Sequence, residues 1–270
     1  IRLDMSRGGA NEATLRSYLN LRFKDYEQKY NITPDPTAML ADRFHAIIAT
    51  AYKQTGLRVA VLIDEYDSPL QHSWRTPEHE KCTGVYREVF AILKADDEYE
   101  QFIFITGITK FTQISLFSVL NNLSNISFMP EYATICGITE EEIKENFMPE
   151  LKQMSEANNW SIQETHDRLK AYYDGYHFSR RNMVDVYNPY SLVNALKSKE
   201  IINFWASSGA TSLLPKFVDN AELRMKNFEN CRIMRNTLEM SDVSGGGAEL
   251  FLYQSGYLTI KGYINGTYLL

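Results

Sequence analysis

The sequence predicts an α/β fold in which helices flank a parallel sheet. Two short apolar runs, at residues 59–65 and 102–107, are rich in Val, Ile and Phe and end in polar residues. Unbroken apolar runs of this length are typical of strands buried on both faces, as in a sheet that lies between helices. Apolar residues at helical spacing lie between the two runs, and this order predicts right-handed crossovers and a mostly parallel sheet.

The individual elements follow from local signals. Asn11 and Thr37 are suited to begin two helices, and Gly56 is suited to end the second. Ser68 followed by Pro69 suits the start of another helix. In chain order we expect a strand over 1–6, helices over 11–26 and 37–56, the strand 59–65, a helix from 68, a helix over 85–93, the strand 102–107 and a weaker strand over 133–136.

The pattern changes after Gly137, which divides the chain into predicted domains 1–137 and 138–270. The second domain reads as mainly helical. Thr139 and Glu142 have the spacing of a capping box before an amphipathic helix. Further helices are expected to begin near residues 161 and 189.

The end of the chain predicts a hairpin. Three glycines at 245–247 predict a flexible joint. Two apolar stretches between 257 and 270 then flank Asn265-Gly266, a strong signal for a tight hairpin turn. We interpret 138–270 as a helical lid followed by a winged-helix-like hairpin.

Composition excludes several classes of protein. The 270 residues carry a net charge of −6, which argues against binding to phosphate backbones through clustered Lys and Arg. No run approaches the roughly 18 apolar residues of a membrane span, and no signal peptide is visible. Three scattered cysteines without metal spacing predict buried free thiols in a reducing cytoplasm. The start at Ile1, within a strand pattern and without Met, predicts a piece of a longer protein.

Asp64 and Glu65 are the main candidates for chemistry. They end the strand 59–65 at the edge where open α/β sheets bind their ligands. This pattern has the form of a Walker B motif in a P-loop ATPase. Asp64 would then hold Mg²⁺ through its water shell, and Glu65 would orient the attacking water. Asp67 is favoured as a turn or helix-cap residue.

The strand 102–107 supplies a second set of candidates. Thr106, Thr109 and Lys110 follow its apolar run. In P-loop ATPases the strand beside Walker B ends in a polar sensor residue near the γ-phosphate or the water, and these three residues are candidates for that role. A G-x-x-x-x-G-K-[ST] phosphate loop is absent from the sequence.

Segments along nearly the whole chain resemble the AAA-ATPase-like family of bacterial P-loop proteins, which often carry a C-terminal PD-(D/E)XK nuclease-like domain. The segments that carry the resemblance are 61–70 (VLIDEYDSPL), 106–111 (TGITKF), 120–123, 131–137, 173–176, 187–189 and 254–260. The resemblance implies ATP and Mg²⁺ as cofactors, Asp64 and Glu65 as the Walker B pair, and Thr106 or Thr109 as the sensor.

The resemblance also implies what lies outside this chain. The phosphate loop would precede Ile1, so we expect the isolated piece to bind nucleotide weakly or not at all. A nuclease-like domain would follow Leu270, and nucleic acid is implied as a partner only through that domain. In the complete protein, ATP hydrolysis would drive a domain rearrangement.

Two other hypotheses remain open. The chain could be a non-catalytic regulatory or interaction module that keeps the ATPase fold without its chemistry. It could also be a metal-dependent hydrolase that uses the carboxylates of Asp64, Glu65 and Asp67. His72 and His79, near two glutamates, are better explained as residues of a solvated loop.

Overall fold

The computed structural model describes residues 1–110, 123–205, 228, 230–240 and 247–270. Contacts divide the chain into two compact units, one holding Ile1–Ser124 and the other holding Asn125–Met240 and the chain from Gly246 to Leu270. The predicted domain boundary at residue 137 stays a prediction.

The first unit is built on the parallel sheet that the sequence predicts. Its strands are β1 (Arg2–Asp4), β2 (Val59–Asp64) and β3 (Glu100–Ile105), in the order β1-β2-β3. Both pairings are parallel. The first unit therefore combines a three-stranded parallel sheet with helices, and this α/β arrangement is compatible with a P-loop-like fold.

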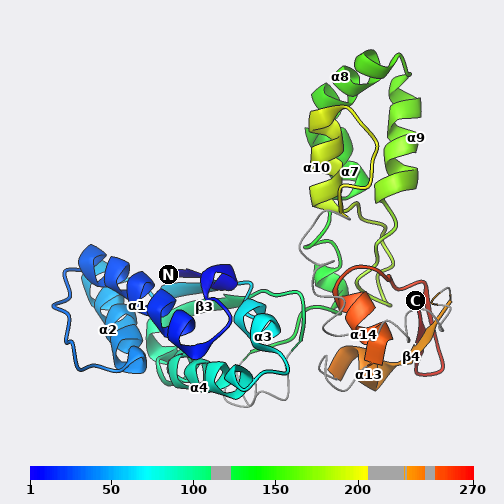
Figure 1. Cartoon of the computed structure of the whole chain (residues 1–270). Helices are drawn as coiled ribbons and strands as arrows, with labels where there is room; N and C mark the ends of the chain where they lie inside the picture. The colour runs from blue at the N-terminus through cyan, green and yellow to red at the C-terminus, as the bar shows by residue number, and fades with distance from the viewer. Residues whose placement is uncertain (111–122, 206–227, 229, 241–246) are drawn as a thin grey trace. The chain divides into compact units, whose positions relative to one another are not determined.

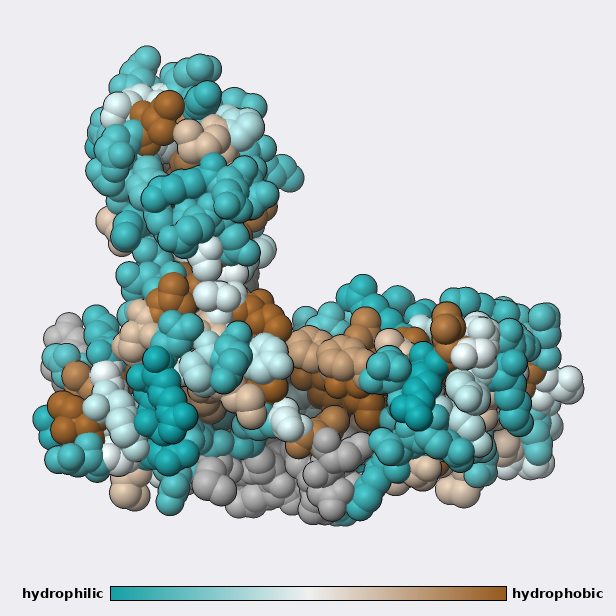
Figure 2. Space-filling model, turned by 180° about the vertical axis from the view of Figure 1, so that it is seen from behind, coloured by the Kyte–Doolittle hydropathy of each residue, from teal (hydrophilic) through white to brown (hydrophobic). Residues whose placement is uncertain are grey.

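One face of this sheet is exposed, and the prediction of burial on both faces is wrong for the described residues. Val61 and Ile63 are buried, whereas Leu62 is 40% exposed and Phe102 is 54% exposed. Buried and exposed residues alternate along β2, and the sequence does not reveal this alternation because the residues on both faces are apolar. Figure 2 shows hydrophobic residues gathered on the first unit (right in the view), seen from behind relative to Figure 1.

Helices pack on the other face of the sheet. Helices α1 (Glu12–Lys29), α2 (Leu40–Thr55) and α4 (Glu78–Phe90) contact one another, and α2 also contacts β2 (Figure 1). Their inward residues are buried with Leu3, Val61 and Ile63 of the sheet. The other short helices in the described part of this unit are η1 (Met5–Arg7), α3 (Ser68–Ser73), α5 (Ile92–Ala95) and η2 (Asp97–Tyr99).

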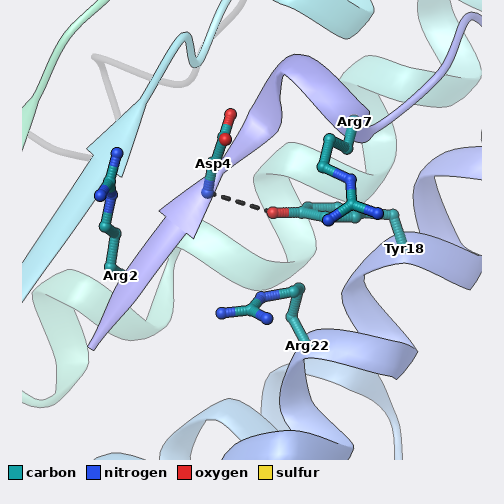
Figure 3. A pocket seen from close by; sticks show the side chains of 5 residues that line it. All are labelled: Arg2, Asp4, Arg7, Tyr18 and Arg22. Atoms are coloured by element: carbon teal, nitrogen blue, oxygen red, sulfur yellow. Dashed lines mark hydrogen bonds between the residues drawn. The ribbon is translucent and has the colours of Figure 1, made fainter.

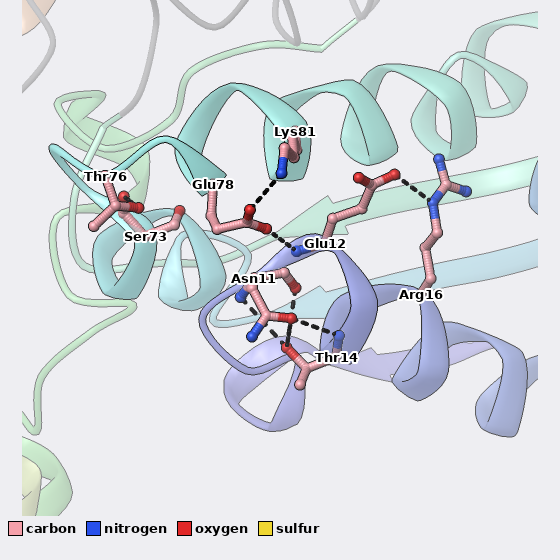
Figure 4. Close-up of polar contacts among 8 residues, drawn as sticks. All are labelled: Asn11, Glu12, Thr14, Arg16, Ser73, Thr76, Glu78 and Lys81. Carbon is pink, nitrogen blue, oxygen red and sulfur yellow. Dashed lines mark hydrogen bonds and ion pairs between the residues drawn. The ribbon is translucent and has the colours of Figure 1, made fainter.

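The start of α1 is fixed by two sets of hydrogen bonds (Figure 4). Asn11 accepts a hydrogen bond from the Thr14 amide at 2.9 Å, in a capping box with the Thr14 side chain. Glu78, in the first turn of α4, accepts one from the Glu12 amide at 3.1 Å. A carboxylate is favourable there because the first amides of a helix lack partners within the helix. Helix α4 is thereby tied to the start of α1.

Helix α2 begins later than expected but ends where predicted. Its N-cap is Met39, because Thr37 instead donates its amide hydrogen to Asp35 Oδ1 at 2.8 Å, in a turn that precedes the helix. Gly56 ends it with φ of 67°, the left-handed conformation that favours glycine.

The second unit begins with a correction. The strand expected over 133–136 is absent, and a 3₁₀ turn, η3 (Pro130–Tyr132), leads into turns there. Thr139 forms the predicted capping box with Glu142. Four helices then share a buried core: α7 (Glu140–Asn146), α8 (Met148–Asn158), α9 (Ile162–Tyr173) and α10 (Pro189–Ser198).

The C-terminal part of this unit contains the predicted hairpin. Its turn residues Asn265 and Gly266 have φ of 47° and 83°, as a type I′ turn requires. A strand that the sequence did not predict joins the hairpin, giving an antiparallel order β4-β6-β5. The elements are β4 (Arg232–Met234), α13 (Arg235–Met240), α14 (Gly247–Gln254), β5 (Gly262–Ile264) and β6 (Thr267–Leu269).

Other predictions for this region stay predictions. Of the expected joint at 245–247, residues 245 and 246 lie outside the described residues, and Gly247 begins α14. The lid and winged-helix interpretations are likewise untested. No described helix is long and apolar enough to cross a membrane.

Candidate functional site

The ends of β2 and β3 bring Asp64 and Thr106 together. Asp64 is the last residue of β2, and Thr106 directly follows β3. The Thr106 amide continues the strand pairing with a 2.8 Å hydrogen bond to the Ile63 carbonyl. Its hydroxyl donates to Asp64 Oδ1 at 2.8 Å. A carboxylate and a hydroxyl thus share the carboxyl edge of the sheet.

Asp64 is also paired with Arg2 on the neighbouring strand. Arg2 Nη2 lies 3.2 Å from Asp64 Oδ2, and the two side chains are 66% and 46% exposed. An ion pair this exposed contributes only about 0–1 kcal/mol. Asp64 therefore remains accessible to a ligand at modest cost.

Glu65 has an unusual backbone conformation. Its φ is 48°, in the left-handed region that non-glycine residues rarely adopt. The side chain is exposed. The pKa of its carboxyl is raised, first by partial desolvation and then by the negative charges of Asp4, Asp64 and Asp67. Strained residues with a raised carboxyl pKa are frequent at functional sites, although structural networks also produce them.

Asp67 and Thr109 are brought together, but in the interior. Asp67 is 1% exposed and Thr109 is 2% exposed. The Thr109 hydroxyl donates to Asp67 Oδ2 at 2.6 Å, so it is engaged away from Asp64. Asp67 takes the predicted N-cap position of α3, yet its side chain makes no capping hydrogen bond.

Lys110 and His72 are the remaining candidates. Lys110 is partly buried and is the last described residue before 111–122. His72 Nδ1 lies 2.7 Å from the Ser68 carbonyl of its own helix. No group of three His, Cys, Asp or Glu residues suited to a metal ion occurs among the described parts of the chain. Because the Asp67 carboxylate faces protein donors, the three-carboxylate hydrolase hypothesis lacks support.

A shallow pocket of about 230 Å³ adjoins this edge and was not anticipated (Figure 3). It is lined by Arg2, Asp4, Arg7, Tyr18 and Arg22. The Tyr18 hydroxyl accepts a hydrogen bond from the Asp4 amide at 3.1 Å, which blocks part of the free edge of β1. Three guanidinium groups against one carboxylate make this pocket suited to an anion.

The charges of the pocket are unequally compensated. Arg22 pairs with Asp25 at 2.9 Å, and Arg2 pairs with Asp64. Arg7 forms no ion pair with any residue that the structure describes. A sequence signal existed, since Arg2 and Asp4 share one face of a strand whose end is followed by Arg7. The strand order needed to place them beside Asp64 was not available from the sequence.

As a single carboxylate, Asp64 could hold Mg²⁺ only through the water shell of the ion. Mg²⁺ usually keeps several waters and is bound by one or two carboxylates. Asp64 is a single carboxylate, half exposed, with the Thr106 hydroxyl bonded to one oxygen. This donor set suits an ion that keeps its water shell.

Parts of this chain are similar to known proteins. Residues 1–117 match the AAA-ATPase-like family, described as "Predicted AAA-ATPase". Over 220 residues the chain is 31% identical to an "Uncharacterized protein in vnfD 5'region" of Azotobacter chroococcum mcd 1. That alignment covers 81% of this chain, and the chain spans 40% of the relative's length. No solved structure matches. Residues 1–117 are thus similar to the AAA-ATPase-like family.

Proposed function

We propose that this chain contributes the Walker B and sensor half of a Mg²⁺-dependent ATPase. The observation that carries the proposal is the 2.8 Å hydrogen bond between Thr106 and Asp64 at the carboxyl edge of a parallel sheet. Phosphoryl transfer depends mainly on positioning and electrostatic stabilisation, for which polar groups from adjacent strands are suited.

The proposed roles follow from accessibility and charge. Asp64 would hold Mg²⁺ through water, and bound Mg²⁺ would neutralise charge on the phosphates. Glu65 is exposed and would orient the attacking water. We assign the sensor role to Thr106, because the Thr109 hydroxyl is bonded to Asp67 in the interior. The guanidinium groups of the neighbouring pocket support an anionic ligand such as a nucleotide phosphate.

The complete natural protein would supply what this chain does not contain. The phosphate loop, the coupling of ATP hydrolysis to a domain rearrangement and a nuclease-like C-terminal domain are proposals from the family resemblance. The helical part of the second unit would act as the lid.

The test is Glu65→Gln in the complete protein. We expect kcat for ATP to fall by at least about 100-fold, because the group that orients water is lost. Binding of ATP and Mg²⁺, measured by calorimetry, should change by no more than about threefold, because Glu65 is not assigned to binding. Glu98→Gln is the matched control, since Glu98 is also exposed but precedes the opposite end of β3.

One observation favours the non-catalytic alternative. Asp64 is already paired with Arg2, and such a pair could replace Mg²⁺ in a protein that has lost nucleotide chemistry. Undetectable turnover in the wild-type protein together with absent ATP binding would support that alternative. Turnover that survives in Glu65→Gln would contradict the assigned role of Glu65.

A further inference from the structure

Among the described residues of the first unit, the buried carboxylate of Asp67 accepts several hydrogen bonds. Its Oδ2 accepts hydrogen bonds from Gln71 Nε2 at 2.5 Å, from the Thr109 amide at 2.5 Å and from the Thr109 hydroxyl at 2.6 Å. Its Oδ1 accepts one from the Ile108 amide at 3.3 Å. All four partners are donors, which matches the acceptor-only character of an ionised carboxylate.

These bonds connect two loops that are distant in sequence. Asp67 follows β2, whereas Ile108 and Thr109 follow β3. Both loops leave the carboxyl edge where Asp64 and Thr106 lie. A buried carboxylate that accepts three hydrogen bonds from one neighbouring loop holds that loop in a single arrangement, because each lost bond would leave a polar group unpaired in the interior.

Tyr66 reinforces the connection. Its amide donates to the Thr106 carbonyl at 2.9 Å, and its hydroxyl donates to the Thr109 carbonyl at 2.9 Å. The Tyr86 hydroxyl of α4 donates in turn to the Tyr66 carbonyl at 2.5 Å. The loop after β3 is therefore held at Thr106 and again at Thr109.

The space between these residues admits only a glycine. A Cβ placed on Gly107 would lie 2.6 Å from the Tyr66 ring and would also meet Asp67 Oδ1. The backbone of the loop after β3 thus lies directly against Tyr66 and Asp67. The close approach at Gly107 and the hydrogen bonds of Tyr66 and Asp67 therefore hold the loop after β3 in the same position.

We propose that Asp67 is a positioning residue whose buried carboxylate fixes the loop of residues 106–109, so that the Thr106 hydroxyl stays on Asp64. The proposal rests on the proposed ATPase function and deepens it. Asp67 is buried and its carboxylate faces protein donors, so it acts through Thr106. Catalytic groups need support of this kind, because small displacements of a polar group weaken its electrostatic effect.

The experiment uses Thr109→Val, Thr109→Ser and Asp67→Asn in the complete protein. Valine preserves the shape of threonine but removes the hydroxyl that donates to Asp67. Serine keeps the hydroxyl. Thr83→Val is the matched control, because Thr83 is 1% exposed and its hydroxyl bonds only the His79 carbonyl of its own helix.

Two readouts separate positioning from stability. Amide hydrogen exchange of the peptide over 106–110 reports whether the loop is held. In Thr109→Val we expect exchange to rise about tenfold and kcat to fall about tenfold, with KM within about twofold. Thr109→Ser should restore both within about twofold. Thr83→Val should lower the melting temperature without changing either quantity.

Asp67→Asn provides an independent variant, because the NH₂ group of asparagine would face N–H and O–H donors in place of an oxygen that accepts their hydrogen bonds. Exchange that is unchanged in Thr109→Val, or that rises equally in Thr83→Val, overturns the proposal. Failure of Thr109→Ser to rescue kcat also overturns it. If the wild-type protein shows no ATP turnover, the ATPase proposal fails, and the exchange readout alone then decides whether Asp67 fixes the loop.

Discussion

The Thr106 hydroxyl donates a 2.8 Å hydrogen bond to Asp64 Oδ1 across two adjacent parallel strands. The two residues are 42 positions apart in sequence and meet because β2 and β3 end at the same edge. The bond orients the carboxylate, whose second oxygen faces Arg2. Any ligand of Asp64 meets a carboxylate that is already held in one direction.

Loss of this bond should impair turnover more than stability. Thr106→Val removes the hydroxyl while keeping the β-branched shape suited to the end of a strand. A hydrogen bond to a charged group contributes about 1.5–3 kcal/mol, so we expect kcat to fall roughly 10- to 100-fold. Steady-state ATPase assays measure this change. Thr106→Ser should stay within about threefold of wild type, and equal losses in both variants would contradict the role of the hydroxyl.

The arginine pocket predicts a salt-dependent effect on nucleotide affinity. Arg7 has no ion-pair partner among the residues that the structure describes, so its charge is available to a phosphate. Arg7→Gln should raise the Kd for ATP about 3- to 10-fold at low salt, and less at high salt because an exposed charge is screened. Arg58→Gln is the control, since Arg58 is exposed just before β2, at the other end of that strand. Equal effects of the two variants would exclude the pocket as the anion site.

Helix caps and turn residues in the sequence correctly predicted those features that depend on interactions between near neighbours in the chain. The capping box at Thr139, the left-handed Gly56 and the turn at Asn265-Gly266 are all formed as expected. Each depends on hydrogen bonds or backbone angles within a few residues. Thr37 failed as a helix start because a neighbouring turn, closed by Asp35, uses its amide.

Features that depend on distant partners were missed. The exposure of Leu62 depends on what packs over the sheet, and the apolar character of β2 does not reveal it. The pairing of Asp67 with Thr109 joins residues 42 positions apart, so neither the interior position of Thr109 nor the role of Asp67 could be derived from spacing. The position of Asp64 and Thr106 at one edge of the sheet could be predicted from the sequence, because the carboxyl ends of parallel strands share an edge.

The burial of Glu100 leads us to expect that the free energy of unfolding falls as pH rises. The side chain is 6% exposed, and neither carboxylate oxygen has a hydrogen-bond partner in the described structure. Burial, followed by the charges of Asp96 and Asp97, raises the pKa of Glu100 to about 8. Between the unfolded pKa near 4.5 and this value, the folded state binds the extra proton. The free energy of unfolding therefore decreases with pH in that window, by up to about 1.4 kcal/mol per pH unit.

Glu100→Gln should remove this dependence, because glutamine does not titrate. Urea denaturation at pH 5, 6, 7 and 8 would show wild type losing stability relative to the variant, with the difference levelling off above pH 8. Glu98→Gln, at an exposed position nearby, should follow wild type. Parallel curves for wild type and Glu100→Gln would show that Glu100 is ionised in the folded protein throughout this range.

Two glycines of the first unit should respond oppositely to alanine. A Cβ on Gly107 would lie 2.6 Å from the Tyr66 ring, so Gly107→Ala should lower the free energy of unfolding by about 1–3 kcal/mol. Nothing lies within 4 Å of a Cβ on Gly84, which is exposed on α4. Gly84→Ala should therefore stabilise the helix by about 0.5–1 kcal/mol. Thermal and urea unfolding measure both, and destabilisation of similar size in the two variants would contradict the close approach at Gly107.

The left-handed backbone at Glu65 predicts a separation of stability from activity. An alanine at φ of 48° keeps the unfavourable contact of its Cβ, whereas a glycine does not. The free energy of unfolding of Glu65→Gly should therefore be about 1 kcal/mol higher than that of Glu65→Ala. Both variants should lose turnover, because the carboxylate is absent.

Asn31, with φ of 53°, is the matched control. Asn31→Gly and Asn31→Ala should show the same difference in stability with turnover unchanged, since Asn31 lies in an exposed turn after α1. Equal stability of Glu65→Gly and Glu65→Ala would show that the backbone at residue 65 relaxes out of the left-handed region, and turnover in either would exclude Glu65 as the residue that orients water.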